Sequence, residues 1–576
     1  MLRVLCLLLA ALPGLAWAAE ADRQFEALTN EYLEGHFAFR PSSAVKLGMH
    51  EYDGRMEIFG RESLDREYAR LQSFSKRLAA FPVEQLSDDL RIDFQILRAA
   101  IREELFWFDG SESFIRNPMT YPRAFKPSMY LTRSYAPIET RLKHIIQMER
   151  QTPQLFANAR ANLKKPLSRV FVETAIKVTD GAASFLEKDV KLALKDVTDQ
   201  KLLAEFEEAN QLALKELRGY SQWLKTEQLP HAQERFALGR EKYFRMVRDQ
   251  ELVEETPEEI LKIGMRELRR EQEVFRAAGR VIDPNKPPLE VFATIQNDHP
   301  TAANLIPDIA KNCESIRQFI LDKKICSIPS EVRAVVDETP SYNRATSFAS
   351  MNSPGPFETK GLEAYYYVTP VDPLWTAVQQ KEWLTAFNYY TSDVLSIHEA
   401  YPGHYVQHLH VNTSKASRLR KIFSSYAFVE GWAHYTEQMV LDEGFGATDK
   451  IQAAKYRMAQ ADESLLRYCR LCCAIQMHCG DMTVDEATKF FQDNCYYAEQ
   501  PARQEATRGS FDPGYLNYSL GKLMIFKLRE DWRKQEGDKF SMQRFHDTML
   551  GQGMPQIPLL RQMMLKDKSQ WAKALE

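Results

Sequence analysis

The chain has 576 residues, of which 44% are hydrophobic and 27% are charged. This composition is typical of a folded globular protein and excludes disorder along the whole length. The formal net charge is -4, so no overall positive field is present to hold nucleic acid, and we expect no nucleic-acid partner.

The N-terminus has the features of a secretory signal peptide in the expected order. A basic start at Met1–Arg3 precedes an apolar run that ends at Trp17, between two small residues. The run is too short to span a bilayer, so we predict a signal peptide over 1–18 and export to the periplasm or the extracellular space. A buried first helix or an uncleaved anchor is the alternative. Cys6 lacks the small residues that usually precede a lipidated cysteine, which argues against a lipoprotein.

Helical periodicity dominates the first half of the remaining chain. Residues 65–78, 88–106 and 199–223 each combine an apolar face with a charged one. The acidic stretch over 254–259 contains Pro257 and predicts the start of another helix. We therefore predict an N-terminal helical lobe over 19–250 and a catalytic lobe over 251–576. This boundary is soft, and one continuous domain is the alternative.

Segments that predict strands are few. Residues 332–336 and 364–368 are rich in β-branched and aromatic residues, and 351–356 predicts a loop between them. Tyr366 lies in the second segment, where an extended peptide could align along an edge strand, although a buried strand fits equally well. The sequence shows no internal repeat and no second apolar span, so we expect no stable membrane insertion once the signal peptide is removed.

Seven cysteines remain after the predicted signal peptide. In an oxidising compartment Cys313 could pair with Cys326, and disulfides could form within the later group, although the sequence does not fix the connectivity. Cys469, Cys472 and Cys473 lie in an apolar helical run without a second Cys-x-x-Cys pair. This context favours core packing or a disulfide over a zinc knuckle.

The most informative motif is Ser396-Ile397-His398-Glu399-Ala400-Tyr401-Pro402-Gly403-His404. In the common His-Glu-x-x-His zinc motif the histidines are four residues apart, and the glutamate activates the attacking water. Here they are six residues apart, which a regular helix would turn through roughly 120°. We therefore expect the helix to break at Pro402-Gly403, so that His398 and His404 bind one metal ion with Glu399 as the base. His408, four residues after His404, is the alternative ligand.

A zinc ion that activates water usually takes three protein ligands and keeps one position open. The third ligand is expected from the predicted helix Phe428–Glu437, which follows the histidines at a distance that fits one helix-loop-helix turn. Glu430 is the first choice. His434 or Glu437 would then orient the metal ligands through hydrogen bonds, without binding the metal themselves.

Three segments together resemble one known family. They are His398–His404, Glu430–Tyr435 and Pro513–Gly521, and their order and spacing resemble the bacterial family catalogued as domain of unknown function 885 over most of the chain. That family is similar to gluzincin metallopeptidases such as thimet oligopeptidase and carboxypeptidase Taq. The resemblance implies a mainly α, zincin-like fold with a deep cleft and a small β-sheet, and zinc-dependent hydrolysis of peptides. The six-residue histidine spacing departs from the four of those peptidases.

Peptide hydrolysis also needs a hydrogen-bond donor for the oxyanion. Tyr515 and Tyr518 are candidates, and resemblance to the tyrosine-bearing helix of the oligopeptidases favours Tyr518; packing aromatics are the alternative. Arg503 and Arg508 could hold a substrate carboxylate, and Arg508 is the better candidate because it lies closer to the tyrosines. Structural ion pairs are the alternative for both. Lys522 is expected on a solvated helix face.

These residues predict a secreted zinc metallopeptidase of the oligopeptidase or carboxypeptidase type, with Zn2+ as cofactor and peptides as substrates. One alternative is a zinc hydrolase of another amide, such as a cell-wall peptide or an acyl-amino acid, which would use the same residues. The other is a non-catalytic peptide-binding protein, against which the intact Glu399 argues. Peptide preference, endo- or exopeptidase action and oligomeric state are not encoded in any motif we find.

Overall fold

The computed structural model describes residues 5–341, 344 and 347–575, with side chains from residue 19 onward. Two compact units share the chain. Unit 1 comprises Met1–Arg235, Phe357–Gly361 and Ser417–Phe423, and unit 2 comprises Phe236–Pro356, Leu362–Ala416 and Ser424–Glu576. Each unit is mainly helical.

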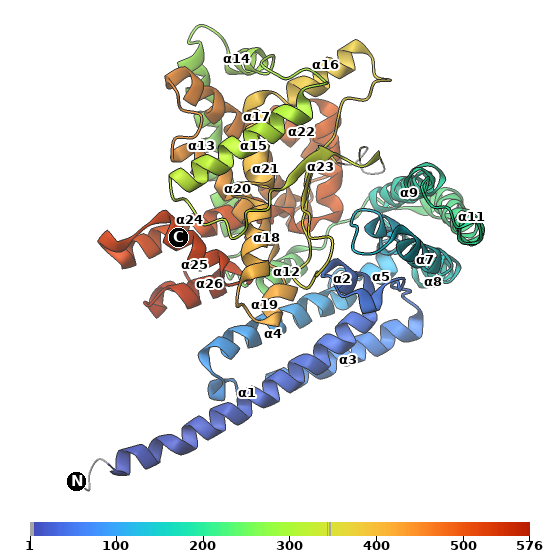
Figure 1. The fold of residues 1–576 in the computed structure, drawn as a ribbon, viewed down its shortest axis with the longest axis vertical. Helices are drawn as coiled ribbons and strands as arrows, with labels where there is room; N and C mark the ends of the chain where they lie inside the picture. The colour runs from blue at the N-terminus through green and yellow to red at the C-terminus, as the bar shows by residue number, and fades with distance from the viewer. Residues whose placement is uncertain (1–4, 342–343, 345–346, 576) are drawn as a thin grey trace. The chain divides into compact units, whose positions relative to one another are not determined.

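Among the described residues of unit 1, every named secondary-structure element is a helix (Figure 1). Its longer helices pack in two groups, α3 against α4, and α7, α8 and α9 around α11. The N-terminus of α11 is capped by the Asp199 carboxylate, which accepts from the backbone N–H groups of Lys201 and Leu202. The α-helices are α1 (Leu5–Phe39), α2 (Pro41–Lys46), α3 (Arg61–Ala79), α4 (Asp88–Asp109), α5 (Ser113–Arg116), α6 (Thr120–Ala124), α7 (Ile138–Glu149), α8 (Thr152–Asn162), α9 (Arg169–Ser184), α10 (Val190–Ala193), α11 (Gln200–Trp223) and α19 (Arg418–Ile422).

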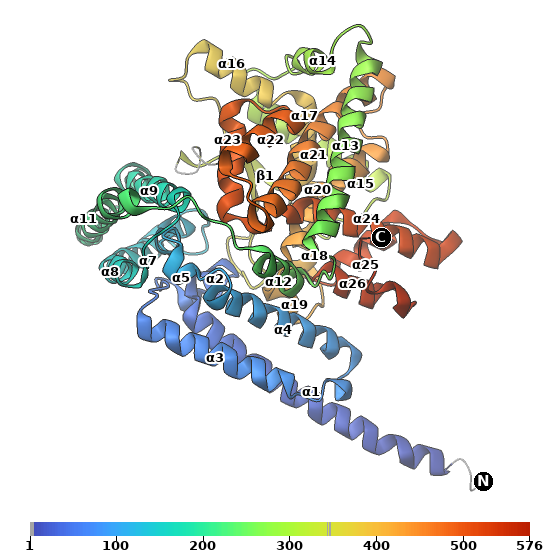
Figure 2. The same ribbon diagram turned by 180° about the vertical axis from the view of Figure 1, so that it is seen from behind.

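Unit 2 is arranged around α21, which packs against α13, α17, α20, α22, α23 and α24 (Figure 2). A capping box between Thr256 and Glu259 starts α13, and a second one between Thr483 and Glu486 starts α22. The α-helices are α12 (Arg240–Glu251), α13 (Pro257–Ile282), α14 (Pro288–Ile295), α15 (Leu305–Asp322), α16 (Ala377–Ala386), α17 (Tyr389–Glu399), α18 (His404–Thr413), α20 (Tyr426–Asp442), α21 (Lys450–Cys479), α22 (Val484–Cys495), α23 (Glu499–Phe511), α24 (Asn517–Glu536), α25 (Met542–Leu550) and α26 (Ile557–Met564).

One small sheet lies in unit 2, against α15 and α17. Its strands are β1 (Val335–Glu338), β2 (Ala349–Asn352) and β3 (Tyr365–Val368), in the order β1-β3-β2. β3 runs parallel to β1 and antiparallel to β2. β3 is therefore the central strand, so of the two alternatives for Tyr366 the buried strand is right and the edge strand is wrong.

The mainly α fold with a small sheet is confirmed, and the three predicted N-terminal helices correspond to α3, α4 and α11. Two local differences concern the sheet. The strand predicted over 332–336 begins only at Val335, and the loop predicted over 351–356 begins inside β2. The deep cleft implied by the resemblance stays a prediction.

The change of unit falls at Arg235–Phe236, whereas the predicted lobe boundary at residue 250 falls within α12. The reason is that α12 packs against α13 and α21 and so belongs to unit 2. Two later segments, Phe357–Gly361 and Ser417–Phe423, also return to unit 1. Sequence periodicity could not predict that these two segments belong to unit 1.

Neither the possible disulfide between Cys313 and Cys326 nor one within the later group is formed, because all seven described cysteines are free. Both residues are buried, Cys313 within α15 and Cys326 beyond its end. The backbone N–H of Ile325 donates to the carbonyl oxygen of Ile320, seven residues after Cys313 in the helix and so about 10 Å along its axis at 1.5 Å per residue, which keeps Cys326 away from Cys313.

The predicted signal peptide, residues 1–18, lies outside the residues whose side chains the structure describes, and so does Cys6. Among the helices that are described, none combines the length and the apolar character needed to cross a membrane.

Candidate metal centre

The chain breaks between α17 and α18, where the sequence places Pro402-Gly403. α17 ends at Glu399 and α18 begins at His404. A Cβ on Gly403 would lie 1.7 Å from the carbonyl oxygen of His398, so only glycine permits this close approach. Trp432 on α20 fixes the turn, because its Nε1 donates to the carbonyl oxygens of Pro402 and Gly403 at 2.9 and 3.3 Å.

This turn brings together the two histidines of the motif. The ring centroids of His398 and His404 are 4.8 Å apart, and the ring planes are nearly perpendicular at 89°. Glu430 on α20 joins them, since its Oε2 lies 3.6 Å from Nε2 of each histidine. The three potential ligand atoms all lie within 4.8 Å of one another. His408 is not part of this group of described residues.

A layer of polar groups lies behind His398. Its Nδ1 is 2.7 Å from Glu437 Oε1, and the other oxygen of Glu437 is 2.9 Å from His434 Nδ1. Arg467 on α21 contacts Glu437 Oε1 at 3.4 Å. Glu437 and His434 are both fully buried, and Glu437 holds His398 so that Nε2 faces Glu430 and His404.

Charges in this layer shift several pKa values. Burial lowers the pKa of His398, but its contacts with Glu430 and Glu437 outweigh burial and raise that pKa to about 9. Burial would raise the pKa of Glu430, yet the two histidines hold it well below its usual range. Burial and the Lys522 ammonium lower the pKa of His434 to about 3, so this imidazole is neutral. His398 must therefore release a proton before its Nε2 can serve as a ligand.

Glu399 is the last residue of α17, directly after His398, and its side chain is partly exposed. Among the described residues, none forms a hydrogen bond or an ion pair with its carboxylate. A carboxylate in this position is free to accept a proton from a water molecule beside the three ligand residues.

Two tyrosines and an arginine form a hydrogen-bonded group near Glu430: Tyr426 on α20, Tyr518 on α24 and Arg508 on α23. Arg508 Nη2 donates to the hydroxyls of Tyr426 and Tyr518, at 3.1 and 3.5 Å. Its Nε donates to Asp512 Oδ2 at 3.0 Å. The negative charge of Glu430 raises the pKa of both tyrosines. For Tyr518 it is the second-largest cause of the raised pKa, after burial. The Tyr426 hydroxyl donates in turn to Asp512 Oδ2 at 3.4 Å, so the Tyr518 hydroxyl is the one whose hydrogen stays available as a donor.

Two glycines let α24, which carries Tyr518, pack closely against α20, which carries Glu430. A Cβ on Gly431 would lie 2.4 Å from Gly521 Cα, and a Cβ on Gly521 would lie 1.8 Å from the carbonyl oxygen of Ala427. α20 and α24 therefore cross with their backbones in contact. Glu430 precedes the first glycine by one residue and Tyr518 precedes the second by three, so this crossing sets their separation.

Comparisons with known proteins give one family and two solved structures. The family model "Bacterial protein of unknown function (DUF885)" matches residues 41–564. The chain belongs to this family. A protein described as a lipoprotein of unknown function from Shewanella oneidensis has a similar fold, with 23% identity, a TM-score of 0.78, and coverage of 94% of this chain and 100% of that one. A protein described as a lipoprotein from Colwellia psychrerythraea has 20% identity and a TM-score of 0.78, with coverage of 96% of this chain and 99% of that one. A search of curated proteins finds no match.

The donor set of this DUF885 protein fits a zinc ion. Two ligand atoms at about 2.1 Å from zinc and at a tetrahedral angle are roughly 3.4 Å apart. The 3.6 Å separations between Glu430 and each histidine are close to this value, and the ligand atoms of the two histidines lie within 4.8 Å of each other. Two imidazoles, one carboxylate and an oriented Nδ1 are also the ligand chemistry that zinc prefers in hydrolases.

Three other predicted site residues lie elsewhere in the DUF885 structure. The Tyr515 hydroxyl is buried against Gly509, where a Cβ would lie 2.1 Å from it, so Tyr515 is a packing aromatic. Arg503 forms an exposed ion pair with Asp485 at 2.9 Å. Tyr366 is fully buried, and its hydroxyl accepts a hydrogen bond from Ser396 Oγ at 3.4 Å. It therefore packs β3 against α17 and does not line the metal centre.

Sequence reasoning missed Tyr426 and Lys522. Tyr426 lies four residues before Glu430 on α20, a spacing that puts both on one helix face and would have been a usable signal. Lys522 is only 1% exposed, which corrects the solvated face expected for it. Its neighbours come from distant parts of the chain, so no local pattern could have found them.

Proposed function

We propose that this DUF885 protein is an exported zinc-dependent peptidase of the gluzincin type. The observation that carries the proposal is the convergence of His398, His404 and Glu430 across a broken helix, with Glu399 next to His398 in the chain at the end of α17. A structural zinc site usually closes its coordination with four protein ligands, whereas three ligands and a neighbouring base suit hydrolysis.

Each residue then has a definite task. Bound zinc supplies Lewis-acid polarisation of the scissile carbonyl and makes the attacking water more acidic. Glu399 accepts a proton from that water and later delivers it to the departing amine, so that the elements of water are added across the amide bond. Glu437 keeps Nδ1 of His398 occupied and thereby fixes which ring nitrogen faces the metal.

The hydroxyl of Tyr518 donates to the carbonyl oxygen as that oxygen gains negative charge, while the hydroxyl of Tyr426 donates to Asp512. Arg508 positions both, because its Nη2 contacts both hydroxyls while its Nε is held by Asp512. These engagements favour a positioning role for Arg508 over the capture of a substrate carboxylate. If Arg508 does not bind the C-terminal carboxylate of the substrate, the site can cleave bonds inside a peptide, as an oligopeptidase does.

Export rests on separate support. The order of features over residues 1–18 matches a signal peptide. The two solved proteins of similar fold are themselves described as lipoproteins. We infer a periplasmic or extracellular location for this chain, where peptides from the surroundings are the accessible substrates.

The decisive variant is Glu399→Gln, compared with Glu382→Gln on an exposed position of α16. Both proteins are loaded with zinc, analysed for metal and incubated with a mixed peptide library whose products are mapped by mass spectrometry. We expect both variants to hold zinc and only Glu399→Gln to lose turnover, because the amide cannot accept the proton. Turnover that survives in Glu399→Gln would exclude Glu399 as the base, and a wild type that binds zinc but cleaves no peptide would favour another amide as substrate.

A further inference from the structure

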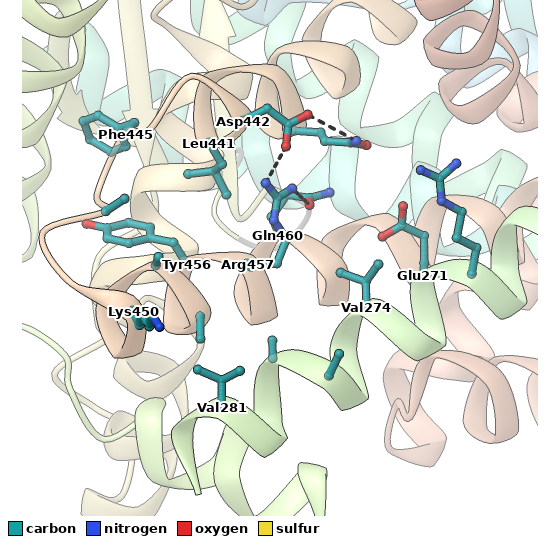
Figure 3. Close-up of a pocket in the computed structure, with 17 residues that line it drawn as sticks. Glu271, Val274, Val281, Leu441, Asp442, Phe445, Lys450, Tyr456, Arg457 and Gln460 are labelled. Carbon is teal, nitrogen blue, oxygen red and sulfur yellow. Dashed lines mark hydrogen bonds and ion pairs between the residues drawn. The ribbon is translucent and has the colours of Figure 1, made fainter. Parts of the chain in front are cut away.

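Helix α21 carries two buried arginines one turn apart, Arg467 and Arg470, which are only 6% and 8% exposed. A third arginine of the same helix, Arg457, lines a separate cavity of about 620 Å³ and pairs there with Asp442 (Figure 3). Neither Arg467 nor Arg470 lines that cavity. Arginine is rarely buried unless it is paired, so the two buried guanidinium groups must be explained by their own partners.

The two buried arginines contact different parts of the candidate site. Arg467 contacts Glu437, the carboxylate that orients His398, at 3.4 Å. Arg470 instead contacts the tyrosine group, because its guanidinium carbon lies over the Tyr518 ring, 5.1 Å from the ring centroid. One helix therefore contacts both the group that orients a metal ligand and the proposed oxyanion donor.

Glu505 on α23 fixes the guanidinium group of Arg470. Arg470 Nε donates to Glu505 Oε2 at 2.7 Å, and Nη2 donates to Oε1 at 2.8 Å. Two parallel hydrogen bonds of this kind set both the position and the plane of a guanidinium group. Glu505 precedes Arg508 by three residues, so one face of α23 supplies the anchor of Arg470 and the second arginine at Tyr518.

The Tyr518 ring is in contact with three side chains. Besides Arg470, the guanidinium carbon of Arg508 lies over the ring, 5.8 Å from its centroid, and Arg508 Nη2 donates to the hydroxyl at 3.5 Å. The ring of Tyr426 meets it edge-on, with centroids 5.8 Å apart. A guanidinium over an aromatic ring is attracted by the electron-rich face, and more strongly where water is excluded. These contacts restrict the rotation of the Tyr518 ring.

The arginines also act on the Tyr518 hydroxyl. Burial and the carboxylate of Glu430 raise the pKa of Tyr518, whereas the charges of Arg470 and Arg508 lower it. A hydroxyl beside cations is a stronger donor to an oxygen that gains negative charge. The effect of Arg470 on Tyr518 is therefore electrostatic as well as geometric.

We propose that Arg470, anchored by Glu505, is a positioning residue that holds Tyr518 in the orientation in which its hydroxyl donates to the oxyanion. Arg470 acts through the tyrosine ring and needs no contact with the substrate or the metal. This inference rests on the proposed peptidase function, because Tyr518 is the oxyanion donor of that function. It adds a residue pair from α21 and α23 to the catalytic arrangement.

A double-mutant cycle in peptide turnover tests the proposal on the whole zinc-loaded protein. Arg470→Met removes the cation, and Glu505→Gln is combined with it so that no unpaired carboxylate is left. We expect this pair of substitutions to lower kcat by about tenfold and to leave KM within about twofold. In a Tyr518→Phe background the same pair should lower kcat by less than about twofold, because the positioned hydroxyl is absent. An equal loss in both backgrounds would indicate a general structural effect and overturn the proposal.

Arg533→Met is the matched control. Arg533 also forms an ion pair with a glutamate, Glu530, and lies over an aromatic ring, that of Phe540, but it is exposed near the C-terminal end of α24. Its loss should leave kcat within about twofold. If the paired variant does not fold in thermal unfolding, Arg470→Lys takes its place, because lysine keeps the charge and loses the planar fork. The same dependence on Tyr518 is expected of it.

A second measurement does not depend on turnover. A 3-fluorotyrosine placed at position 518 of the whole protein reports the surroundings of the ring through its fluorine NMR resonance. We expect the resonance to shift when Arg470 and Glu505 are replaced and to stay in place in Arg533→Met. An unchanged resonance in the paired variant would overturn the proposal. If the wild type shows no peptide turnover, the proposed function fails, and the fluorine comparison still decides whether Arg470 positions Tyr518.

Discussion

The crossing of α20 and α24 at Gly431 and Gly521 makes a sharp prediction about catalysis. In Gly521→Ala the new methyl group would lie 1.8 Å from the carbonyl oxygen of Ala427. A methyl carbon and a carbonyl oxygen need roughly 3.3 to 3.6 Å, so the helices must separate by about 1.5 Å or slightly more. Tyr518, one turn before Gly521 on α24, moves away from Glu430 with the helix.

Two different losses follow from this shift. Overpacking costs about 1 to 3 kcal/mol of stability, which the large helical unit can absorb. A displacement of about 1 Å at a group that stabilises the transition state costs about 100-fold in rate. The zinc content should not change, because His398, His404 and Glu430 lie on α17, α18 and α20, and none lies on α24.

The assay combines metal analysis, thermal unfolding and peptide turnover on the same preparation. Gly181→Ala is the matched control, because Gly181 lies exposed in α9 with no atom within 4 Å of the added Cβ. It should keep full turnover and gain up to about 1 kcal/mol. Full turnover in Gly521→Ala, or loss of zinc together with turnover, would refute the reasoning that the crossing positions Tyr518.

Three further predictions concern single side chains. Tyr518→Phe should lower kcat by about 100-fold with zinc content unchanged, as measured by turnover and metal analysis, and an unchanged kcat would exclude the hydroxyl as the oxyanion donor. Glu437→Gln should weaken zinc affinity by about 10- to 100-fold in a competitive chelator titration, because Nδ1 of His398 loses its carboxylate partner. Burial raises the pKa of Glu149 to about 9, and its two carboxylate oxygens have no partner among the described residues. The folded protein therefore retains a proton that the unfolded chain releases above about pH 4.3, so stability falls as the pH rises toward 9. Glu149→Gln should be about 3 kcal/mol more stable than wild type at pH 7 and about equally stable at pH 4, and urea unfolding at both values with no such difference would contradict this assignment.

The sequence predicts the metal residues because their geometry is decided locally. Proline and glycine at 402 and 403 break a helix wherever they occur in its interior, and the break is what lets His398 and His404 meet. Glu430 follows from its place on the next predicted helix, and Glu437 from helical periodicity, since residues seven apart share a face. These relations need no knowledge of the rest of the fold.

The errors come from contacts between distant segments. Alternation along β3 says that Tyr366 faces opposite to its neighbours, but only the pairing of β1 and β2 on both sides shows that the strand is central. Lys522 has the sequence context of a surface lysine, yet it is buried beside groups from α13, α20 and α21. The need for glycine at 431 and 521 becomes visible only in the folded structure, where the backbones of α20 and α24 are in contact.

The most direct test of the metal centre is zinc stoichiometry of the purified protein by mass spectrometry, after zinc loading and removal of free metal. We predict one zinc per chain in the wild type and in His408→Ala, and none in His398→Ala or Glu430→Ala. A wild type that holds no zinc, or a Glu430→Ala variant that retains a full equivalent, would contradict the assignment of these three residues to one ion.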